Sequence, residues 1–357
     1  MSNGSDIAFA HELLSPFCEC CGVSGFEHEG KNPIGRYITE CIKPYCDEAY
    51  LDRAGNIIAF KRGKARPKSK VMLAAHMDEV GFVIKHINDD GTLLFDGIGI
   101  SPSAMPCSRV RIGDSGVHGV IGMTPIHLLS KQEREKPVSE DSLFIDIGAS
   151  GKEEAEKYVA VGDFAVFDNG CVPLSDTRLI GKAIDDRIGC AVLCDIIKET
   201  LPYDTYFAFT VREELGTLGA SAAVNGVKPD IAVAVEATPA SDIPSCEGSD
   251  RVCVLGGGTV LPTIDGGTSY DKALGLIARD IAEKAGIKYQ NKQKIAGGTD
   301  ARTFQRASGG VRVLGIALPC RYIHTASCVA DAGDVIATKN LATLIAQSFG
   351  GIDTDRI

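Results

Sequence analysis

Two adjacent carboxylates, Glu213 and Glu214, occupy a position in the sequence where chemistry can be expected. They follow Tyr203–Phe209, an alternating aromatic and aliphatic run typical of a buried strand, and they precede Thr217–Val224, which is typical of the start of a helix. Open α/β sheets bind ligands at the carboxyl ends of their strands. Most Glu-Glu pairs are solvated helix charges, so a functional interpretation needs support from other segments.

A second segment of this kind is His76-Met77-Asp78, which follows the apolar run Lys70–Ala75. A nearly continuous apolar run is expected of a strand buried on both faces. If the chain stays extended past this strand, residues two apart point the same way, and Asp78 could orient His76. A carboxylate commonly does this for an imidazole that binds a metal.

Three further segments place ionisable residues at similar boundaries. Asp185 and Asp186 open the apolar helix predicted over Cys190–Glu199, where plain helix capping is an alternative interpretation. Glu236 ends the predicted strand Asp230–Val235. His324 follows the predicted strand at 311–316.

Imidazole and carboxylate are ligands that zinc and cobalt accept. Five such residues, with one shared, can hold two metal ions: His76, Asp185, Glu214, Glu236 and His324. Three carboxylates and a shared hydroxide balance the charge of two divalent cations, whereas one cation would leave buried negative charge in excess. Glu213 then remains available as a base.

The elements that must position these residues indicate an α/β fold interrupted by a β-rich insert. From residue 81 to 161, short β-like runs alternate with glycine turns, which is typical of a small all-β unit. We therefore predict a catalytic domain over residues 1–78 and 162–357 and an inserted domain over 79–161. Within the insert, 127–141 is predicted to be a mobile charged loop, and His118 and His127 are interpreted as structural or surface residues. The last element, 334–349, is predicted to be an amphipathic helix.

Composition limits the possible partners and the compartment. The formal net charge of −10 argues against a nucleic-acid groove or an anionic membrane partner. No apolar run approaches the roughly 20 residues needed to span a bilayer, and no signal peptide is recognisable. The 13 cysteines are irregularly spaced, which favours a reduced, cytoplasmic protein over a disulfide framework. Cys18, Cys20 and Cys21 lack a second pair at zinc-finger spacing, so we interpret them as structural.

Taken together, the segments resemble the M42 family of metallo-aminopeptidases, which includes glutamyl aminopeptidases and enzymes that form tetrahedral shells. The resemblance runs essentially from end to end. It is carried by six segments: Ala75–Gly81, Gly181–Arg187, Glu213–Gly216, Val235–Thr238, Gly297–Ala301 and Arg321–His324. Jointly these segments are highly specific, although singly only the first two would be persuasive.

The resemblance implies a mixed-sheet, three-layer catalytic domain like that of zinc exopeptidases, with the β-rich insert as a dimerisation domain. It implies that one metal is held by His76 and Glu236, that the other is held by Glu214 and His324, and that Asp185 bridges them. Asp78 would orient His76, and Glu213 would be the general base and acid. The metals would be zinc or cobalt, or alternatively manganese. The substrates would be peptides with a free N-terminus, and dimers would assemble into dodecamers.

One departure from the family pattern and three rival functions remain at this stage. Many family members carry Asp where this chain has Glu236, which leaves the denticity of that ligand open. A glycoside hydrolase would need two carboxylates but not two metal-binding histidines, and the chain has no Trp for a sugar platform. A non-catalytic metal-binding shell protein conflicts with the intact Glu213. A carboxypeptidase is the third alternative.

Overall fold

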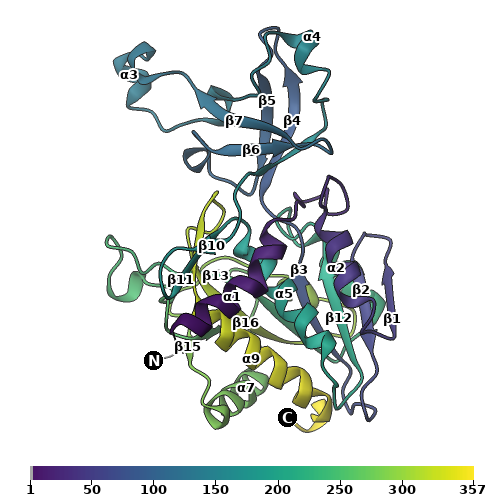
Figure 1. Cartoon of the computed structure of the whole chain (residues 1–357). Helices are drawn as coiled ribbons and strands as arrows, with labels where there is room; N and C mark the ends of the chain where they lie inside the picture. Colours follow the sequence, from purple (N-terminus) through teal and green to yellow (C-terminus); the bar gives the residue numbers. More distant parts are fainter. Residues whose placement is uncertain (1–2) are drawn as a thin grey trace.

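The computed structural model describes residues 3–357 and contains a large mixed sheet with helices on both faces and a separate closed barrel (Figure 1). Among the described residues the large sheet has 11 strands in the order β1-β2-β12-β3-β13-β16-β17-β11-β10, with β14 paired to β16 and β15 paired to β14. Their bounds are β1 Glu48–Leu51, β2 Ile57–Lys61, β3 Val71–His76, β10 Val172–Pro173, β11 Arg178–Gly181, β12 Thr205–Thr210, β13 Ile231–Pro239, β14 Thr259–Leu261, β15 Tyr289–Asn291, β16 Arg312–Arg321 and β17 Cys328–Asp331.

The centre of the sheet is parallel. Strands β12, β3, β13 and β16 lie side by side in this order, with β3 and β13 buried along almost their whole length. Their near-continuous apolar sequences suit a position covered on both faces. The antiparallel strands β1, β2, β17, β11 and β10 extend the sheet on either side. The predicted mixed α/β sheet is thereby confirmed.

The helices form a layer on each face of the sheet. Their bounds are α1 Asn3–Cys18, α2 Ile34–Ile42, α5 Ile184–Lys198, α6 Leu218–Val227, α7 Lys272–Ala285, α8 Ala301–Phe304 and α9 Ala332–Ser348. Leu73 and Ala75 share a core with α1, α2, α5, α7 and α9. Met72 and Ala74, which point the opposite way from the same strand, pack with α6 and α8. The two separate cores show that the sheet lies between two layers of helices.

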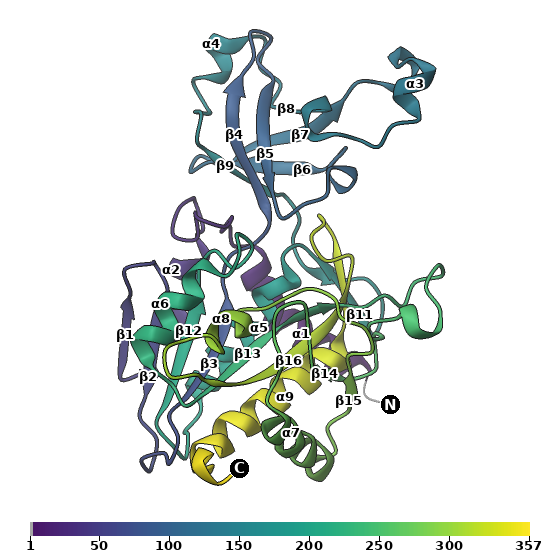
Figure 2. The same cartoon turned by 180° about the vertical axis from the view of Figure 1, so that it is seen from behind.

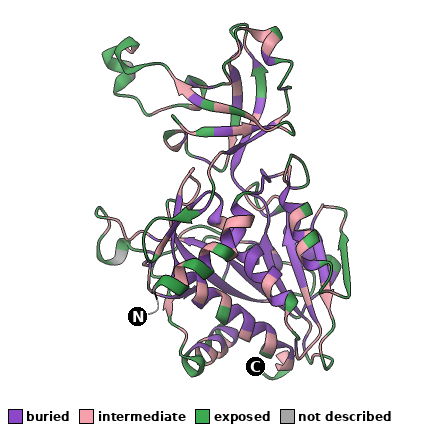
Figure 3. Ribbon diagram, viewed as in Figure 1, coloured by how far each residue is buried: buried purple, intermediate pink, exposed green. Residues whose placement is uncertain are grey.

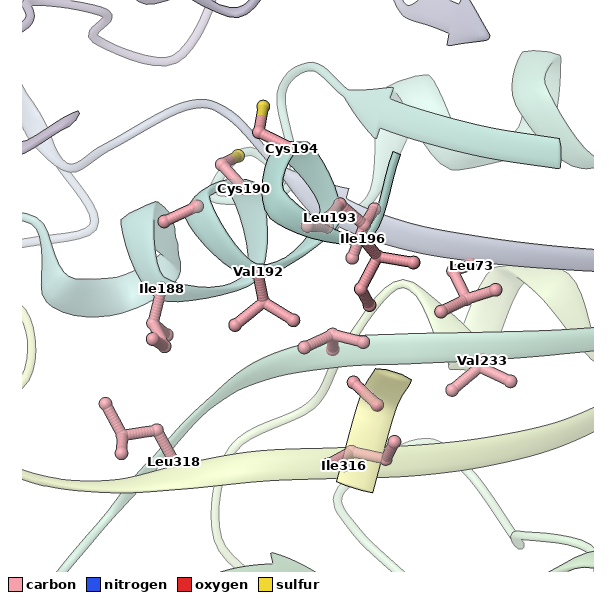
Figure 4. Close-up of a cluster of buried hydrophobic side chains, with 14 of the residues drawn as sticks. Leu73, Ile188, Cys190, Val192, Leu193, Cys194, Ile196, Val233, Ile316 and Leu318 are labelled. Atoms are coloured by element: carbon pink, nitrogen blue, oxygen red, sulfur yellow. The ribbon is translucent and has the colours of Figure 1, made fainter. Parts of the chain in front are cut away.

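Helix α5 is the main cover of the first face. Figure 4 shows Ile188, Val192 and Ile196 of α5 above Val233 and Ile316 of the central strands. All five side chains are at most 1% exposed. Such burial stabilises by about 1.5–3 kcal/mol for each large aliphatic side chain, so it fixes where α5 begins relative to the strand ends.

The last helix differs from its prediction. Helix α9 was expected to be amphipathic, but its buried positions include Val335, Ala337, Leu341 and Thr343, which are spread over much of its circumference. It packs against α1 and α7 as well as against β16, so neighbours on several sides cover it. Figure 3 shows the resulting concentration of buried residues in the central strands and their covering helices.

The β-rich segment closes into a barrel of six strands in the order β4-β5-β8-β7-β6-β9 (Figure 2). The bounds are β4 Gly81–Ile87, β5 Leu93–Ile98, β6 Arg109–Ile112, β7 Val117–Met123, β8 Leu143–Asp146 and β9 Phe164–Phe167, with the short helices α3 Lys131–Arg134 and α4 Lys152–Ala155 in its loops. The barrel has its own apolar core, which includes Phe82, Phe95 and Phe167. Strand β9 pairs with β4 and β6, so the barrel extends past residue 161.

Four residues, Met77 to Val80, connect β3 to the first strand of the barrel. Within them Glu79 is 1% exposed and forms ion pairs of 2.7 Å with Lys182 Nζ and with Arg187 Nη2. Arg187 also donates to the carbonyl of Met77, and the backbone of Glu79 is hydrogen bonded to Gly22 and Ser24. Removing one partner of such a buried pair typically costs about 3–5 kcal/mol, so this connection is held firmly.

Two further observations concern features expected from composition. No helix within residues 3–357 is long and apolar enough to cross a membrane. All 13 cysteines are free thiols, and most of them are buried.

Candidate metal centre

The carboxyl ends of the central parallel strands meet at one edge of the sheet, and the predicted residues gather there. His76 is the last residue of β3 and pairs in register with Thr210, the last residue of β12. Ala74 pairs with Ala234 of β13, so Glu236, two residues further on, reaches the level of His76 on the same face of the sheet. Parallel pairing of apolar strands thus aligns a histidine and a carboxylate that are far apart in sequence.

Asp185 lies between two imidazoles. Its Oδ1 is 3.2 Å from Nε2 of His76, and its Oδ2 is 3.7 Å from Nε2 of His324. The same nitrogen of His324 is 3.3 Å from Oε1 of Glu214. Ligand atoms of His76, Asp185 and Glu214 all lie within 4.8 Å of one another. The two oxygens of one carboxylate therefore face two different histidines.

The start of α5 separates the two neighbouring aspartates. Ala183 has a left-handed φ of 53°, and Asp185 and Asp186 depart from helical φ/ψ values. Asp186 accepts hydrogen bonds from the backbone N–H of Gly189 at 2.9 Å and of His76 at 3.2 Å, as a capping residue would. Asp185 is left free to face the histidines. The capping interpretation therefore fits Asp186 but not Asp185.

Asp78 is completely buried, and it contacts the Glu213–Glu214 turn as well as His76. The Nδ1 atom of His76 lies 3.1 Å from the backbone carbonyl oxygen of Asp78 and 3.5 Å from its carboxylate. Oδ1 and Oδ2 of Asp78 accept the backbone N–H groups of Glu213 and Glu214, each at 3.0 Å. Asp78 therefore contacts the histidine at the end of β3, mainly through its backbone carbonyl, and holds the Glu-Glu turn after β12 through its carboxylate.

The Glu213–Glu214 turn is built from unusual backbone conformations. Arg212 and Thr217 have φ values of 57° and 59°, and Gly216 has φ 101°, a value that glycine adopts most readily. The N–H of Gly216 donates to the carbonyl of Glu213. The turn directs Glu214 toward His324, while Glu213 faces the same cavity without a hydrogen-bonded side-chain partner among the described residues.

Glu236 is held by the segment that leads into α8. Its Oε1 accepts the backbone N–H of Asp300 at 3.2 Å. Asp300 is 1% exposed, and its Oδ2 accepts a hydrogen bond of 2.5 Å from the Thr210 hydroxyl, while its Oδ1 has no partner among the described residues. The segment Gly297–Ala301, interpreted from sequence only as a turn and a family signature, therefore supports the strand ends directly.

The site concentrates negative charge in a buried place. Burial raises the pKa of Glu213 to about 9, with Asp300 and Glu214 adding to the effect and His76 opposing it. Burial also raises the pKa of Glu236 well above its usual range. Burial acts to lower the pKa of His324, but hydrogen bonds to Asp185 and Glu214 outweigh it and raise this pKa to about 11. The cluster therefore favours protons or cations.

The donor set matches what a divalent metal requires. It consists of imidazole nitrogens and carboxylate oxygens, which zinc, cobalt and manganese accept. The Nε2 atoms of both histidines face the carboxylate of Asp185. The buried carboxylates gathered at this point need positive charge to balance their negative charge. The residues present therefore fit metal ions, and the position of Asp185 fits a ligand shared by two of them.

A cavity of about 610 Å³ opens over these residues. Its lining includes six of the seven predicted site residues: His76, Asp185, Glu213, Glu214, Glu236 and His324. Asp78 lies beneath them and does not line the cavity. His118 is far from this site, since it pairs with Asp168 on the barrel at 3.0 Å, and His127 is exposed.

Sequence reasoning missed several supporting residues. The backbone contacts of Asp78 and the ion pairs of Glu79 join segments more than 100 residues apart, and no local pattern reveals them. Lys292 also lines the cavity, although its neighbours in sequence carry no recognisable motif.

Comparison with known proteins identifies similar sequences over nearly the whole chain. A family model described as M42 glutamyl aminopeptidase matches residues 55–341. A candidate aminopeptidase of Acetivibrio thermocellus is 37% identical, covering 95% of this chain and 98% of that protein. The lysyl aminopeptidase of Pyrococcus furiosus is 32% identical, covering 96% and 98%. The glutamyl aminopeptidase of Lactococcus lactis is 29% identical, covering 95% and 96%.

Solved structures are also similar along their whole length. An aminopeptidase from Desulfurococcus kamchatkensis has a TM-score of 0.89 at 35% identity, covering 97% of this chain and 96% of that one. The TET1 peptidase of Pyrococcus horikoshii, which can assemble into a tetrahedron or a large octahedral shell, has a TM-score of 0.81 at 32% identity, covering 95% and 99%. A Thermotoga maritima protein named as an endoglucanase has a TM-score of 0.77 at 32% identity, covering 94% and 97%.

Proposed function

Because this chain belongs to the M42 glutamyl aminopeptidase family, we propose that it is a dinuclear metal-dependent aminopeptidase that removes N-terminal residues from peptides. The observation that carries the proposal is the position of Asp185, whose two oxygens face two different histidines. His76 and Glu236 would hold one metal, Glu214 and His324 the other, and Asp185 both. The metals would be zinc or cobalt, with manganese as a further option.

Bound divalent cations would supply Lewis acidity to the scissile carbonyl and would acidify the attacking water. The remaining chemistry belongs to the chain. Glu213 is the carboxylate in the cavity without an assigned metal, so it takes the proton from the water and returns it to the departing amine. Asp78 keeps Glu213 and Glu214 in fixed directions through their backbone N–H groups.

Substitution of the adjacent glutamates tests these assignments. Glu213→Gln keeps the size of the side chain but removes the base, so it should retain both metals and lose activity by roughly 10²–10⁴-fold, the usual scale of general acid–base catalysis. Glu214→Gln weakens a ligand, so it should lower metal occupancy, and excess metal should partly restore its activity. Metal content by mass spectrometry is measured beside peptidase rates. If Glu213→Gln loses metal while Glu214→Gln retains it, the two roles assigned here are reversed.

Removal of the metals tests the proposal as a whole. A chelator should abolish hydrolysis of aminoacyl substrates, and added Co²⁺ or Zn²⁺ should restore it. Full activity in metal-free protein would refute a metal-dependent mechanism. Chelator-insensitive hydrolysis of a β-glucan would instead favour the glycoside hydrolase alternative. The name of the similar Thermotoga maritima protein raises this alternative. It gives no role, however, to the two histidines that face Asp185.

We also propose that the barrel joins subunits into dimers that assemble further into a dodecamer. Similar proteins form shells, and the barrel carries exposed apolar side chains at Ile126 and Leu128, which are 69% and 67% exposed. Ile126→Glu with Leu128→Glu should yield a smaller particle by light scattering. Tyr158→Ser, on a different loop of the barrel, is the matched control. An unchanged particle in the double variant would place the subunit contacts elsewhere.

A further inference from the structure

The mouth of the cavity over the metal centre is bordered by large apolar side chains that remain exposed. Leu215, Leu218, Ile264, Ile295 and Tyr322 are between 47% and 56% exposed. They come from four separate segments of the chain, so no single amphipathic element accounts for them. Single exposed apolar side chains are ordinary on protein surfaces, but a group of them around one opening indicates a binding surface.

Leu215 and Leu218 lie in the turn after β12 and at the start of α6. Between them, Gly216 and Thr217 line the cavity. The hydroxyl of Thr217 lies 2.5 Å from the hydroxyl of Thr303 in α8. The two leucines therefore flank the cavity lining at a point where this turn contacts α8.

Ile264 lies on the next segment around the mouth. Arg302 of α8 lines the cavity and packs its aliphatic stem over Gly267, three residues after Ile264. Gln305, just after α8, donates a hydrogen bond of 2.8 Å to the carbonyl of Gly267. Helix α8 thus contacts both the turn that bears the leucines and the loop of Ile264, and it joins the two into one border.

Ile295 continues the border from the loop of Ile264. The N–H of Gly266 donates to the carbonyl of Gly297 at 2.7 Å, which ties this loop to the segment of Ile295. Gly297 lies two residues after Ile295 and lines the cavity. The two isoleucines therefore occupy adjoining segments at the same edge of the opening.

Tyr322 closes the border. It lines the cavity itself and lies in the loop between β16 and β17, two residues before His324. Nε2 of His324 is 3.3 Å from the carboxylate of Glu214, which directly precedes Leu215. The contacts between successive segments thus place all five apolar side chains around one opening.

We propose that this apolar border binds the second and third residues of the peptide, so that the enzyme prefers substrates whose residues after the first are apolar. This inference rests on the proposed aminopeptidase function. An aminopeptidase holds the first residue beside its metals, and the rest of the peptide must leave through the mouth. An extended chain advances about 3.3 Å per residue, so the residues after the first lie over the border.

The alternative occupant of an exposed apolar surface is a second copy of the chain. The five side chains surround the opening through which substrate enters, and a subunit packed on all of them would close it. A peptide that passes over the border leaves the opening in use. Contact with apolar substrate side chains also removes apolar surface of both partners from water, which is favourable.

The test compares kcat/KM for the peptides Ala-Leu-Leu-Ala and Ala-Ser-Ser-Ala and for alaninamide, which is too short to reach the border, in the metal-loaded, full-length protein. The variants are Leu218→Ser and the double change Ile264→Ser with Ile295→Ser. Leu276→Ser is the matched control, because Leu276 on α7 is 56% exposed, as Leu218 is, and does not line the cavity. The ratio of the leucine to the serine peptide is the readout, because partial unfolding or metal loss lowers both rates by the same factor.

Wild type should cleave the leucine peptide faster than the serine peptide. Leu218→Ser and the double variant should each lower this ratio about 3- to 10-fold, the scale expected when part of a large aliphatic side chain no longer becomes buried on binding. The rate on alaninamide should not change, and Leu276→Ser should behave as wild type. A ratio that stays at the wild-type value in both variants overturns the inference, while cleavage of alaninamide leaves the aminopeptidase function intact.

Light scattering on the same variants separates the alternative occupant. A smaller particle in either variant, with the peptide ratio unchanged, would show that the border is a subunit contact, and this result also overturns the proposed preference. Failure to cleave any substrate with any added metal would refute the aminopeptidase function itself, and this inference with it.

Discussion

Substitution of Asp78 by asparagine should damage the site more than its distance from the cavity suggests. Its two carboxylate oxygens accept the N–H groups of Glu213 and Glu214 at 3.0 Å each, in a place with no solvent exposure. Asparagine offers one oxygen and an amide NH₂, so one backbone N–H would lose its acceptor and face another donor. The change removes a negative charge and leaves two buried donors opposed.

The magnitude follows from these contacts. Losing one hydrogen bond to a charged group costs about 1.5–3 kcal/mol, and leaving a buried donor unsatisfied costs about 1–3 kcal/mol more. We therefore expect a loss of roughly 3–5 kcal/mol, which corresponds to a fall of roughly 5 °C in thermal midpoint for a chain of 357 residues. A displacement of about 1 Å at a reacting group can reduce catalysis about 10²-fold. Since Glu213 and Glu214 both move, kcat/KM should fall by at least that factor.

The assay combines calorimetry, metal content and kcat/KM on one aminoacyl substrate. Asp230→Asn is the matched control, because Asp230 also accepts a backbone N–H, that of Lys70 at 2.7 Å, at the other end of β3. The control should lose a little stability and no activity. If Asp78→Asn keeps its metals and stays within about threefold of wild-type kcat/KM, the idea that one carboxylate aligns both glutamates is wrong.

Two other predictions concern stability away from the site. Burial acts to raise the pKa of Asp271, but hydrogen bonds from Arg312 and from the N–H of Leu274 outweigh it and hold this pKa below its usual value. Since the folded-state pKa is the lower one, the stabilisation is present above about pH 4 and is lost as pH falls through the folded-state pKa. Asp271→Asn, which can still cap α7, should therefore cost about 1 kcal/mol at pH 7 and progressively less below pH 4 in denaturant titrations, and a difference constant with pH would contradict this. Gly189→Ala would press a Cβ against the carbonyl of Val235 and should destabilise the protein by about 1–3 kcal/mol. The control is Gly226→Ala in α6, whose added Cβ meets nothing within 4 Å, so it should be neutral or slightly stabilising. Equal denaturation midpoints for the two variants would show that α5 can shift away from β13.

The residues at the strand ends could be predicted because each leaves a local signal. An apolar run followed by a histidine or carboxylate is readable in sequence, and parallel pairing then brings such positions together, as with His76 and Glu236. The second role of Asp78 could not be predicted, because its hydrogen bonds to Glu213 and Glu214 depend on how two loops meet in space. The place of Lys292 in the cavity lining could not be predicted for the same reason, since no local pattern marks it.

Some element boundaries escaped prediction for a related reason. Strand β9 is as apolar as a strand of the main sheet, and only its pairing with β4 and β6 assigns it to the barrel. Helix α9 has small residues on the faces that touch its neighbours, and Ala342 and Ala346 do not show in sequence whether they face solvent or another helix. In both cases the deciding information is the identity of the neighbouring element.

The ion pairs of Glu79 have a mechanical consequence. The barrel is joined to the end of β3 by only four residues, and a chain of that length spans at most about 14 Å when fully extended. Without further contacts, a rotation of the barrel would therefore be transmitted through these four residues to His76. Glu79 lies within this connection and is fixed in place. Its carboxylate forms ion pairs with Lys182 and Arg187, and its backbone is hydrogen bonded to the segment after α1. If the barrel joins subunits as proposed, forces on it would be taken up at Glu79, and His76 and the residues beside it would keep their alignment.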